Sequence, residues 1–209
     1  MSILLKTIAV VDVNIGNTAS VQRMLHNVGF QGRLVKTPDD LLGIDKVILP
    51  GVGHFDEGIR RLQKSGLAQA LVERTLDKSI IMMGICLGMQ MLCRGSEEGK
   101  LQGLGLIEAD VKKFSSPPKS KMKIPHMGWN VVSSVQENSL LPDTREEQRF
   151  YFVHSYKVVP DNPAIIIGST KYNTDFCSAF QQGNVFGVQF HPEKSHRFGM
   201  ALMNRFGSL

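Results

Sequence analysis

The chain has 209 residues, of which 42% are hydrophobic and 21% are charged. This is the composition of an ordinary globular protein, and it excludes a disordered or fibrous chain. At roughly 150 residues per domain, the length favours one large domain, and we expect residues 1–209 to form it. The formal net charge of +5 is compatible with an acidic or phosphorylated partner but does not require one.

Three cysteines, Cys86, Cys93 and Cys177, are an odd number in a chain of this size. Free thiols in a reducing compartment are therefore expected. The apolar run over residues 1–13 is too short to span a membrane, and no small-residue cleavage site follows it. We interpret this run as the first strand of a cytoplasmic protein.

Short apolar runs and helical patterns alternate over the first half of the chain. The runs predict strands at residues 8–11, 47–49 and 80–83, and the patterns between them predict helices at 18–28 and 56–76. Strands that alternate with helices indicate parallel βαβ units. We expect these helices to pack on the faces of a mostly parallel sheet.

The second half is richer in strand patterns. Strands are predicted at residues 109–114, 129–135, 150–159, 165–169, 176–180 and 185–190, with a closing helix at 198–206. No linker is long or polar enough to separate a second domain. The fold class is therefore α/β: one domain with a mostly parallel central sheet flanked by helices, and additional antiparallel strands in its C-terminal half.

Five lysines lie between residues 112 and 123 without an acidic residue: Lys112, Lys113, Lys119, Lys121 and Lys123. Serines and prolines at positions 115–118 interrupt this stretch, and no aromatic residues alternate with the lysines as in single-stranded nucleic-acid sites. We predict a solvated loop and no nucleic-acid partner.

The strongest local motif is GICLG at residues 84–88, directly after an apolar strand. Glycines two positions before and after Cys86 suit a sharp strand-to-helix elbow, because a Cβ at either position would crowd the turn. At a helix N-terminus the thiolate form is favoured, and the amide of Leu87 faces a developing oxyanion. The alternative is a structural cysteine between packing glycines.

The other two cysteines are predicted to be core residues. Cys93 follows two turns further along the same predicted helix, next to Leu92, and Cys177 lies in a strand pattern.

A nucleophilic cysteine needs a base, and the base needs an orienting acceptor. His191 and Glu193 lie two residues apart at the end of a predicted strand, and Pro192 keeps this extended segment out of a helix. A solvated strand end is the alternative. With His196 the pair also resembles metal ligands, but the histidine spacing does not match a helical turn and no second cluster completes a site, so no metal or other cofactor is expected.

A further element is PGVG at residues 50–53, at the end of a predicted strand. Its glycines allow backbone amides to approach a ligand closely and to form the second half of an oxyanion hole. The alternative is a simple strand-to-loop turn.

Together, GVG at 51–53, GICLGMQ at 84–90 and FHPE at 190–193 resemble the class I (triad) glutamine amidotransferases. PHMGWN at 125–130 and YFVHSY at 151–156 are similar to the glutaminase-subunit branch of the imidazole glycerol phosphate synthases. The resemblance spans nearly the whole chain. It implies that Cys86 attacks the side-chain amide of glutamine, that His191 protonates the leaving ammonia, and that Glu193 orients His191.

The resemblance also implies an oxyanion hole from the amides of Val52, Gly53 and Leu87. The positions that match the family's glutamine pocket are Gly53, Gln90, Glu98, Ser155 and Tyr156.

In such enzymes the ammonia passes to a (β/α)₈ synthase subunit, with which the glutaminase forms a heterodimer that makes imidazole glycerol phosphate and AICAR in histidine biosynthesis. The docking surface implied by the resemblance includes Asn14, Met127, Trp129 and Lys194.

Two departures leave the ammonia acceptor open. The family usually begins with Asp-Tyr-Gly-x-Gly-Asn, whereas this chain has DVNIGN at residues 12–17, so its turn at Val13 and Asn14 is altered. The string EKSHRFG at 193–199 resembles a branch that serves amidation of surface sugars. A catalytically silent partner-binding protein and a cysteine peptidase of similar fold are the remaining alternatives.

Overall fold

A computed structural model describes residues 5–115, 123–141 and 147–209. Its helices are α1 Thr18–Asn27, α2 Phe55–Lys64, α3 Leu67–Leu76, α4 Leu87–Met91 and α5 His196–Ser208, with short 3₁₀ turns η1 Pro38–Leu41, η2 Pro163–Ile165 and η3 Pro192–Lys194. Its strands are β1 Thr7–Val11, β2 Gln31–Val35, β3 Lys46–Gly51, β4 Ile81–Cys86, β5 Gly95–Ser96, β6 Ala109–Lys113, β7 His126–Ser134, β8 Gln148–His154, β9 Tyr156–Pro160, β10 Ile166–Tyr172, β11 Thr174–Gln182 and β12 Val185–Val188.

The main path of the sheet runs β2-β1-β3-β4-β12-β11-β10-β7-β8. The pairs from β2 through β12 are parallel, and those from β12 through β8 are antiparallel. The predicted mixed sheet is therefore confirmed. β12 lies beside β4, although about half of the chain separates them, and this pairing joins the two halves of the fold.

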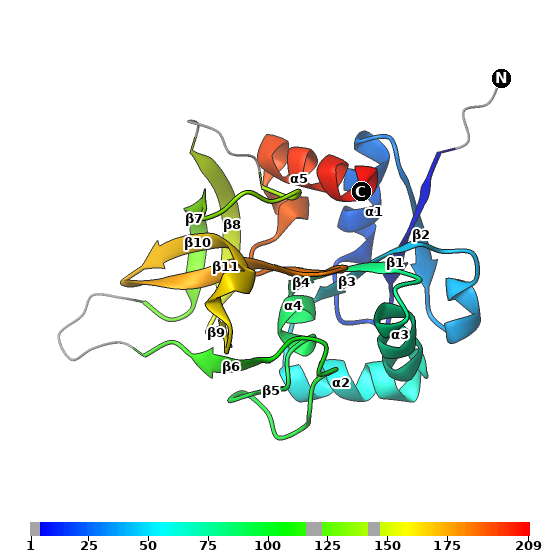
Figure 1. Cartoon of the computed structure of the whole chain (residues 1–209), viewed down its shortest axis with the longest axis horizontal. Helices are drawn as coiled ribbons and strands as arrows, with labels where there is room; N and C mark the ends of the chain where they lie inside the picture. The colour runs from blue at the N-terminus through cyan, green and yellow to red at the C-terminus, as the bar shows by residue number, and fades with distance from the viewer. Residues whose placement is uncertain (1–4, 116–122, 142–146) are drawn as a thin grey trace.

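Helices cover both faces of the parallel half (Figure 1). α1 and α5 lie on one face, and α2, α3 and α4 lie on the other. The strands are buried on both sides, as in β3, where Val47 and Leu49 join the core cluster under α2 and α3 while Ile48 joins the cluster under α1 and α5. Continuous apolar strands are what a sheet covered on both faces requires.

The closing helix, α5, also packs its apolar side chains into the core. α5 buries Leu202, Met203 and Phe206 in the cluster that also holds Val21 and Leu25 of α1. α1 begins after Asn17, whose side chain accepts a hydrogen bond from the backbone N–H of Ser20 at 3.2 Å, as expected for an N-cap.

No helix formed by the described residues is long and apolar enough to cross a membrane.

The predicted single helix over residues 56–76 is wrong, because the structure has two helices there. α2 ends at Lys64 and α3 begins at Leu67, and Gly66 between them has a φ of +77°. A left-handed residue cannot continue a right-handed helix. The apolar spacing of the two helices runs on across the break, which is why the pattern resembled one helix.

The predicted strand over residues 150–159 is also two strands, β8 and β9, which separate at Ser155. β8 pairs with β7, whereas β9 pairs with β6 and β11. β2 was not predicted, because only Val35 of this edge strand is buried and its sequence QGRLV lacks an apolar run. In the lysine-rich stretch, Lys112 and Lys113 belong to β6, and residues 116–122 lie outside the described residues.

Candidate active site

Cys86 is the last residue of β4 and stands directly before α4. Its φ of +55° is uncommon for a residue with a side chain and marks a strained turn. A Cβ on Gly88 would lie 1.8 Å from the Leu49 carbonyl oxygen, and one on Gly84 would lie 2.6 Å from the Met89 nitrogen. The prediction that the elbow needs glycine on both sides of Cys86 is confirmed.

The helix after the elbow is shorter than predicted. α4 ends at Met91, so Cys93 lies beyond it and not on the same helical face as Cys86. Cys93 and Cys177 are both buried core residues, as predicted. Burial raises the pKa of each of these two thiols well above its usual range, so both stay protonated and unreactive at neutral pH.

His191 follows β12, the strand that lies beside β4. Its Nδ1 lies 2.8 Å from Oε1 of Glu193, and both side chains are almost fully buried. The segment is not extended as predicted, because residues 192–194 form η3 with Pro192 at its first position. Pro192 therefore starts a 3₁₀ turn, which brings the Glu193 side chain back to His191.

The carboxylate of Glu193 accepts from Nδ1–H of His191, which fixes the tautomer and leaves Nε2 for the reacting groups. Nε2 of His191 and Oε2 of Glu193 have no hydrogen-bond partner among the described residues. Burial alone would lower the pKa of His191, but the interactions with Cys86 and Glu193 outweigh it and raise this pKa to about 10. The imidazole is therefore protonated at neutral pH and is ready to give a proton.

Residues 50–53 were expected to form the second half of the oxyanion hole, but the Val52 amide of this segment is directed away from Cys86. The backbone N–H of Val52 donates to the carbonyl oxygen of Ile15, so in this conformation it is not available to an oxyanion at Cys86. Gly53 has a φ of +102°, which a glycine adopts readily. Leu87 is the first residue of α4, where a backbone N–H has no acceptor within its own helix.

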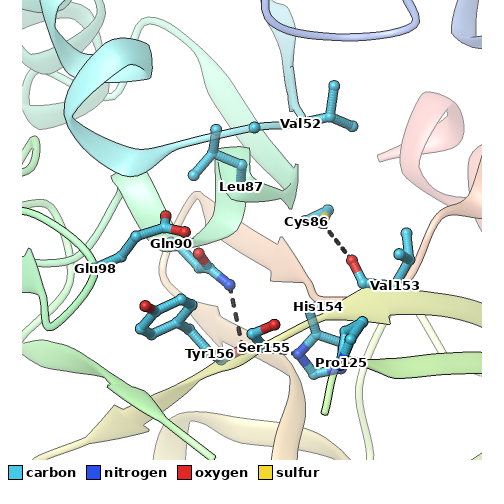
Figure 2. A pocket seen from close by; sticks show the side chains of 11 residues that line it. Val52, Cys86, Leu87, Gln90, Glu98, Pro125, Val153, His154, Ser155 and Tyr156 are labelled. Carbon is cyan, nitrogen blue, oxygen red and sulfur yellow. Dashed lines mark hydrogen bonds between the residues drawn. The ribbon is translucent and has the colours of Figure 1, made fainter.

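A cavity of about 300 Å³ opens beside Cys86 (Figure 2). It is lined by all five residues predicted for the glutamine pocket, Gly53, Gln90, Glu98, Ser155 and Tyr156, and by Val52, Cys86, Leu87, Pro125, Val153 and His154. The carboxylate of Glu98 accepts the backbone N–H of Phe55, the first residue of α2, at 2.8 Å. Sequence reasoning missed Pro125, Val153 and His154 as pocket residues, although all three belong to strings that it singled out.

Sequence reasoning also missed a buried histidine pair that touches this cavity. Nδ1 of His126 lies 3.0 Å from Nε2 of His154, and Nδ1 of His154 lies 2.7 Å from the Tyr156 carbonyl oxygen. The side-chain amide of Asn130 donates to Nε2 of His126 at 3.2 Å. Burial lowers the pKa of His126 to about 4 and that of His154 to about 3, so both rings are neutral at neutral pH.

Three of the four predicted docking residues lie on neighbouring elements. Met127 and Trp129 project from β7, with 62% and 47% of their surfaces exposed. The ring of Trp129 stacks on His196 at 5.5 Å, and Nζ of Lys194 lies 5.6 Å from the centre of the Tyr151 ring. Asn14 lies in the loop after β1, where its carbonyl oxygen accepts a hydrogen bond from Arg61 at 2.6 Å.

The residues predicted not to bind a metal have other partners. His191 and Glu193 bond to one another, and the ring of His196 stacks on Trp129. Within the part of the chain that the structure describes, no group of three or more His, Cys, Asp or Glu side chains has the arrangement of a metal site.

Comparisons with known proteins agree with this geometry. The sequence model of the family "Glutamine amidotransferase class-I" matches residues 9–207. "Imidazole glycerol phosphate synthase subunit HisH 2" of Pseudomonas aeruginosa is 47% identical over 202 residues, which cover 97% of this chain and 99% of that protein. The protein of the same name from Methanococcus maripaludis is 44% identical over 199 residues, covering 95% and 98%.

Solved structures share the fold at lower identity. The PurLQS structure from Thermotoga maritima matches with a TM-score of 0.74 at 20% identity and covers 98% of this chain and 97% of that one. A glutamine amidotransferase from the same organism matches with a TM-score of 0.65 at 21% identity, covering 93% and 78%.

Proposed function

This chain belongs to the class-I glutamine amidotransferases, and we propose that within this family it is the glutaminase subunit of an imidazole glycerol phosphate synthase. The observation that carries the proposal is that Cys86, at a strained elbow beside a cavity, interacts with His191 of the His191–Glu193 pair, which follows the neighbouring strand β12. Relatives that carry this name match over nearly their whole length.

The proposed reaction begins with the thiolate of Cys86, which attacks the side-chain carbonyl carbon of glutamine. The tetrahedral intermediate collapses when the imidazolium of His191 gives its proton to the amide nitrogen and ammonia leaves. A water molecule, deprotonated by the now neutral His191, then attacks the γ-glutamyl thioester. Glutamate and the Cys86 thiolate are released, and His191 is protonated again.

Glu193 supports this cycle through His191. Its carboxylate holds Nδ1–H at 2.8 Å, which keeps Nε2 directed to the reacting groups and stabilises the imidazolium. An intact triad does not fit a catalytically silent protein. The cavity, with polar side chains from Gln90, Glu98 and Tyr156 in its lining, suits a small amino acid better than a peptide chain.

The Val52 amide makes this glutaminase dependent on a partner. Because its N–H is bonded to Ile15, the oxyanion hole lacks one donor until the peptide turns. We propose that docking of a (β/α)₈ synthase subunit, with its ligand bound, releases this bond and completes the hole. Met127, Trp129 and Lys194, with Asn14, form the proposed docking surface, and a cytoplasmic heterodimer in histidine biosynthesis follows from the same proposal.

The test is glutamate release by the purified chain, alone and with the ligand-bound synthase partner. We expect very slow turnover alone and at least about a hundredfold activation by the partner, on the scale of one oxyanion-hole donor. Rapid turnover by the chain alone, unchanged by the partner, would contradict the proposal. A partner that binds a nucleotide sugar instead of an imidazole-pathway ribonucleotide would assign the ammonia to sugar amidation.

Labelling with a glutamine analogue that alkylates the nucleophile, followed by peptide mapping, tests the assignment of the thiol. Cys86 is expected to carry the label because it lines the cavity, whereas burial raises the pKa values of the Cys93 and Cys177 thiols, which do not. A label on either of the latter with Cys86 untouched would refute the triad.

A further inference from the structure

We propose that Gln189 is a further catalytic residue of this site, whose side-chain amide donates a hydrogen bond to the sulfur of Cys86 and stabilises its thiolate. The inference rests on Cys86 being the nucleophile of the proposed function. Gln189 is fully buried and lies two residues before His191. Its Nε2 lies 3.8 Å from Sγ of Cys86, within the range of N–H···S hydrogen bonds.

The orientation of the Gln189 amide follows from its neighbours. Nε2 of Gln90 lies 3.3 Å from the carbonyl oxygen of Tyr156 and 3.1 Å from Oε1 of Gln189. A backbone carbonyl oxygen only accepts, so Gln90 must present its amide N–H groups to it. The second N–H of Gln90 then requires an oxygen on Gln189, and the NH₂ group of Gln189 is left facing the sulfur.

The Tyr156 carbonyl oxygen is itself held in place. It accepts from Nδ1 of His154 at 2.7 Å as well as from Gln90, which uses both of its lone pairs. The amide chain from Tyr156 through Gln90 to Gln189 therefore has one consistent set of donors and acceptors, and this set ends with a donor at Cys86.

A second contact of the sulfur explains why this donor matters. Sγ of Cys86 lies 3.9 Å from the carbonyl oxygen of Val153 (Figure 2). A thiol can donate to that oxygen, but a thiolate cannot, so the Val153 carbonyl favours the protonated form. The N–H of Gln189 favours the charged form, because a hydrogen bond to an anion is stronger than one to a neutral group.

The burial of Gln189 also argues for a specific role. An amide that is fully withdrawn from water is unfavourable unless its polar atoms are hydrogen-bonded. An apolar side chain of the same length would fill this space without that requirement. Here the oxygen of Gln189 bonds to Gln90 and its nitrogen to Cys86, so both of its polar atoms serve residues that line the cavity.

The test is the rate of Cys86 alkylation by iodoacetamide as a function of pH, followed by peptide mass mapping of the full chain. Gln189→Met removes the donor at nearly constant volume. We expect the pH–rate curve to move to higher pH, so that alkylation at a fixed pH below the midpoint slows by up to about tenfold. Gln182→Met, at the exposed end of β11, is the matched control and should leave the curve unchanged.

A second variant addresses the same donor without altering position 189. Gln90→Met adds no charge and removes the amide that holds the Gln189 oxygen, so the NH₂ group of Gln189 is no longer fixed toward the sulfur. The midpoint should again rise. Thermal unfolding of both variants near the wild-type temperature shows that the chain still folds.

A pH–rate curve that matches wild type in both variants would overturn the proposal. Reduced glutaminase turnover with an unmoved curve would also overturn it, since that result describes a purely structural role. The alkylation needs neither glutamine nor a partner. If the wild type does not hydrolyse glutamine even with its partner while the curve still shifts, the proposed function fails, and Gln189 is a residue that tunes the Cys86 thiol and not a catalytic one.

Discussion

Two regions of this molecule bury histidine in opposite charge states. His191 after β12 is 1% exposed, and His126 and His154 of β7 and β8 are 3% and 6% exposed. The pKa of His191 is raised to about 10, whereas those of His126 and His154 are lowered to about 4 and 3. The comparison shows that burial alone keeps a histidine neutral, and that acidic partners at His191 outweigh the same burial.

The partners explain the contrast. His191 faces the acidic groups of Glu193 and Cys86, which favour the imidazolium. In the other pair, Asn130 donates to His126, His126 donates to His154, and His154 donates to the Tyr156 carbonyl oxygen. Each ring therefore accepts at Nε2 and donates at Nδ1. An added proton would occupy an acceptor and break this chain of hydrogen bonds.

The largest expected effect comes from removing the charged histidine. His191→Ala, assayed with the partner present, should lower kcat by about ten-thousandfold or more, because it deletes the group that moves the proton. His26→Ala on the exposed face of α1 is the control and should retain wild-type turnover. Retention of more than about a tenth of the activity by His191→Ala would remove this residue from the reaction.

Glu193→Gln should have a smaller effect, because Glu193 orients and charges His191 but does not touch the substrate. We expect kcat to fall by roughly a hundredfold. The pKa of His191, followed by NMR of the imidazole, should move down toward its ordinary value once the carboxylate is gone. Full activity, or a loss as large as that of His191→Ala, would each contradict a purely orienting role.

The neutral pair should influence substrate binding more than the chemical step. In His154→Gln the bond to the Tyr156 carbonyl oxygen is weakened, and Tyr156 lines the cavity. We expect the KM for glutamine to rise about five- to tenfold with kcat within about twofold of wild type, on the scale of one hydrogen bond. A fall in kcat with unchanged KM would instead place His154 in the chemistry.

The last expected effect concerns the free energy of unfolding as a function of pH, and not activity. Because the folded pKa values of His126 and His154 lie below the unfolded value of 6.5, the unfolded chain binds more protons as the pH falls. Stability should therefore decrease from about pH 6.5 toward about 4, by about 1 kcal/mol per pH unit for His154. Urea unfolding at several pH values measures it, and the slope should flatten in His154→Gln. An equal slope in both proteins would contradict the lowered pKa.

The ionisation of His191 should change stability with pH in the opposite direction. Its raised pKa means that its contribution to stability is fully present below pH 6.5 and is lost as the pH rises toward 10. The free energy of unfolding should therefore fall below neutral pH because of His126 and His154, and fall above neutral pH because of His191.

The elements that sequence reasoning found are those with local signals. The glycines at 84 and 88 enforce the elbow around Cys86, so their spacing alone predicted it. The helix break at Gly66 was missed because apolar periodicity runs across it, and β2 was missed because only one of its side chains, that of Val35, is buried. Gln189 and His154 were missed because their partners are brought to them by strand pairing, which local sequence does not encode.

The amide of Val52 illustrates a different limit. The PGVG segment was singled out from its glycines, but the direction of one peptide N–H depends on the carbonyl of Ile15, which lies on another loop. A glycine pattern indicates that a backbone can turn, and only the packed structure shows which way it has turned.

The position of β12 between β4 and β11 also sets the time at which the protein acquires its site during synthesis. Cys86 and His191 are 105 residues apart in the chain, and a ribosome that adds about 5–20 residues per second needs roughly 5–20 s to cross that interval. During this interval the nascent chain contains Cys86 but not yet His191. Under the proposed mechanism, a chain released before His191 is made is inert toward glutamine, so premature termination would not produce an unregulated source of ammonia.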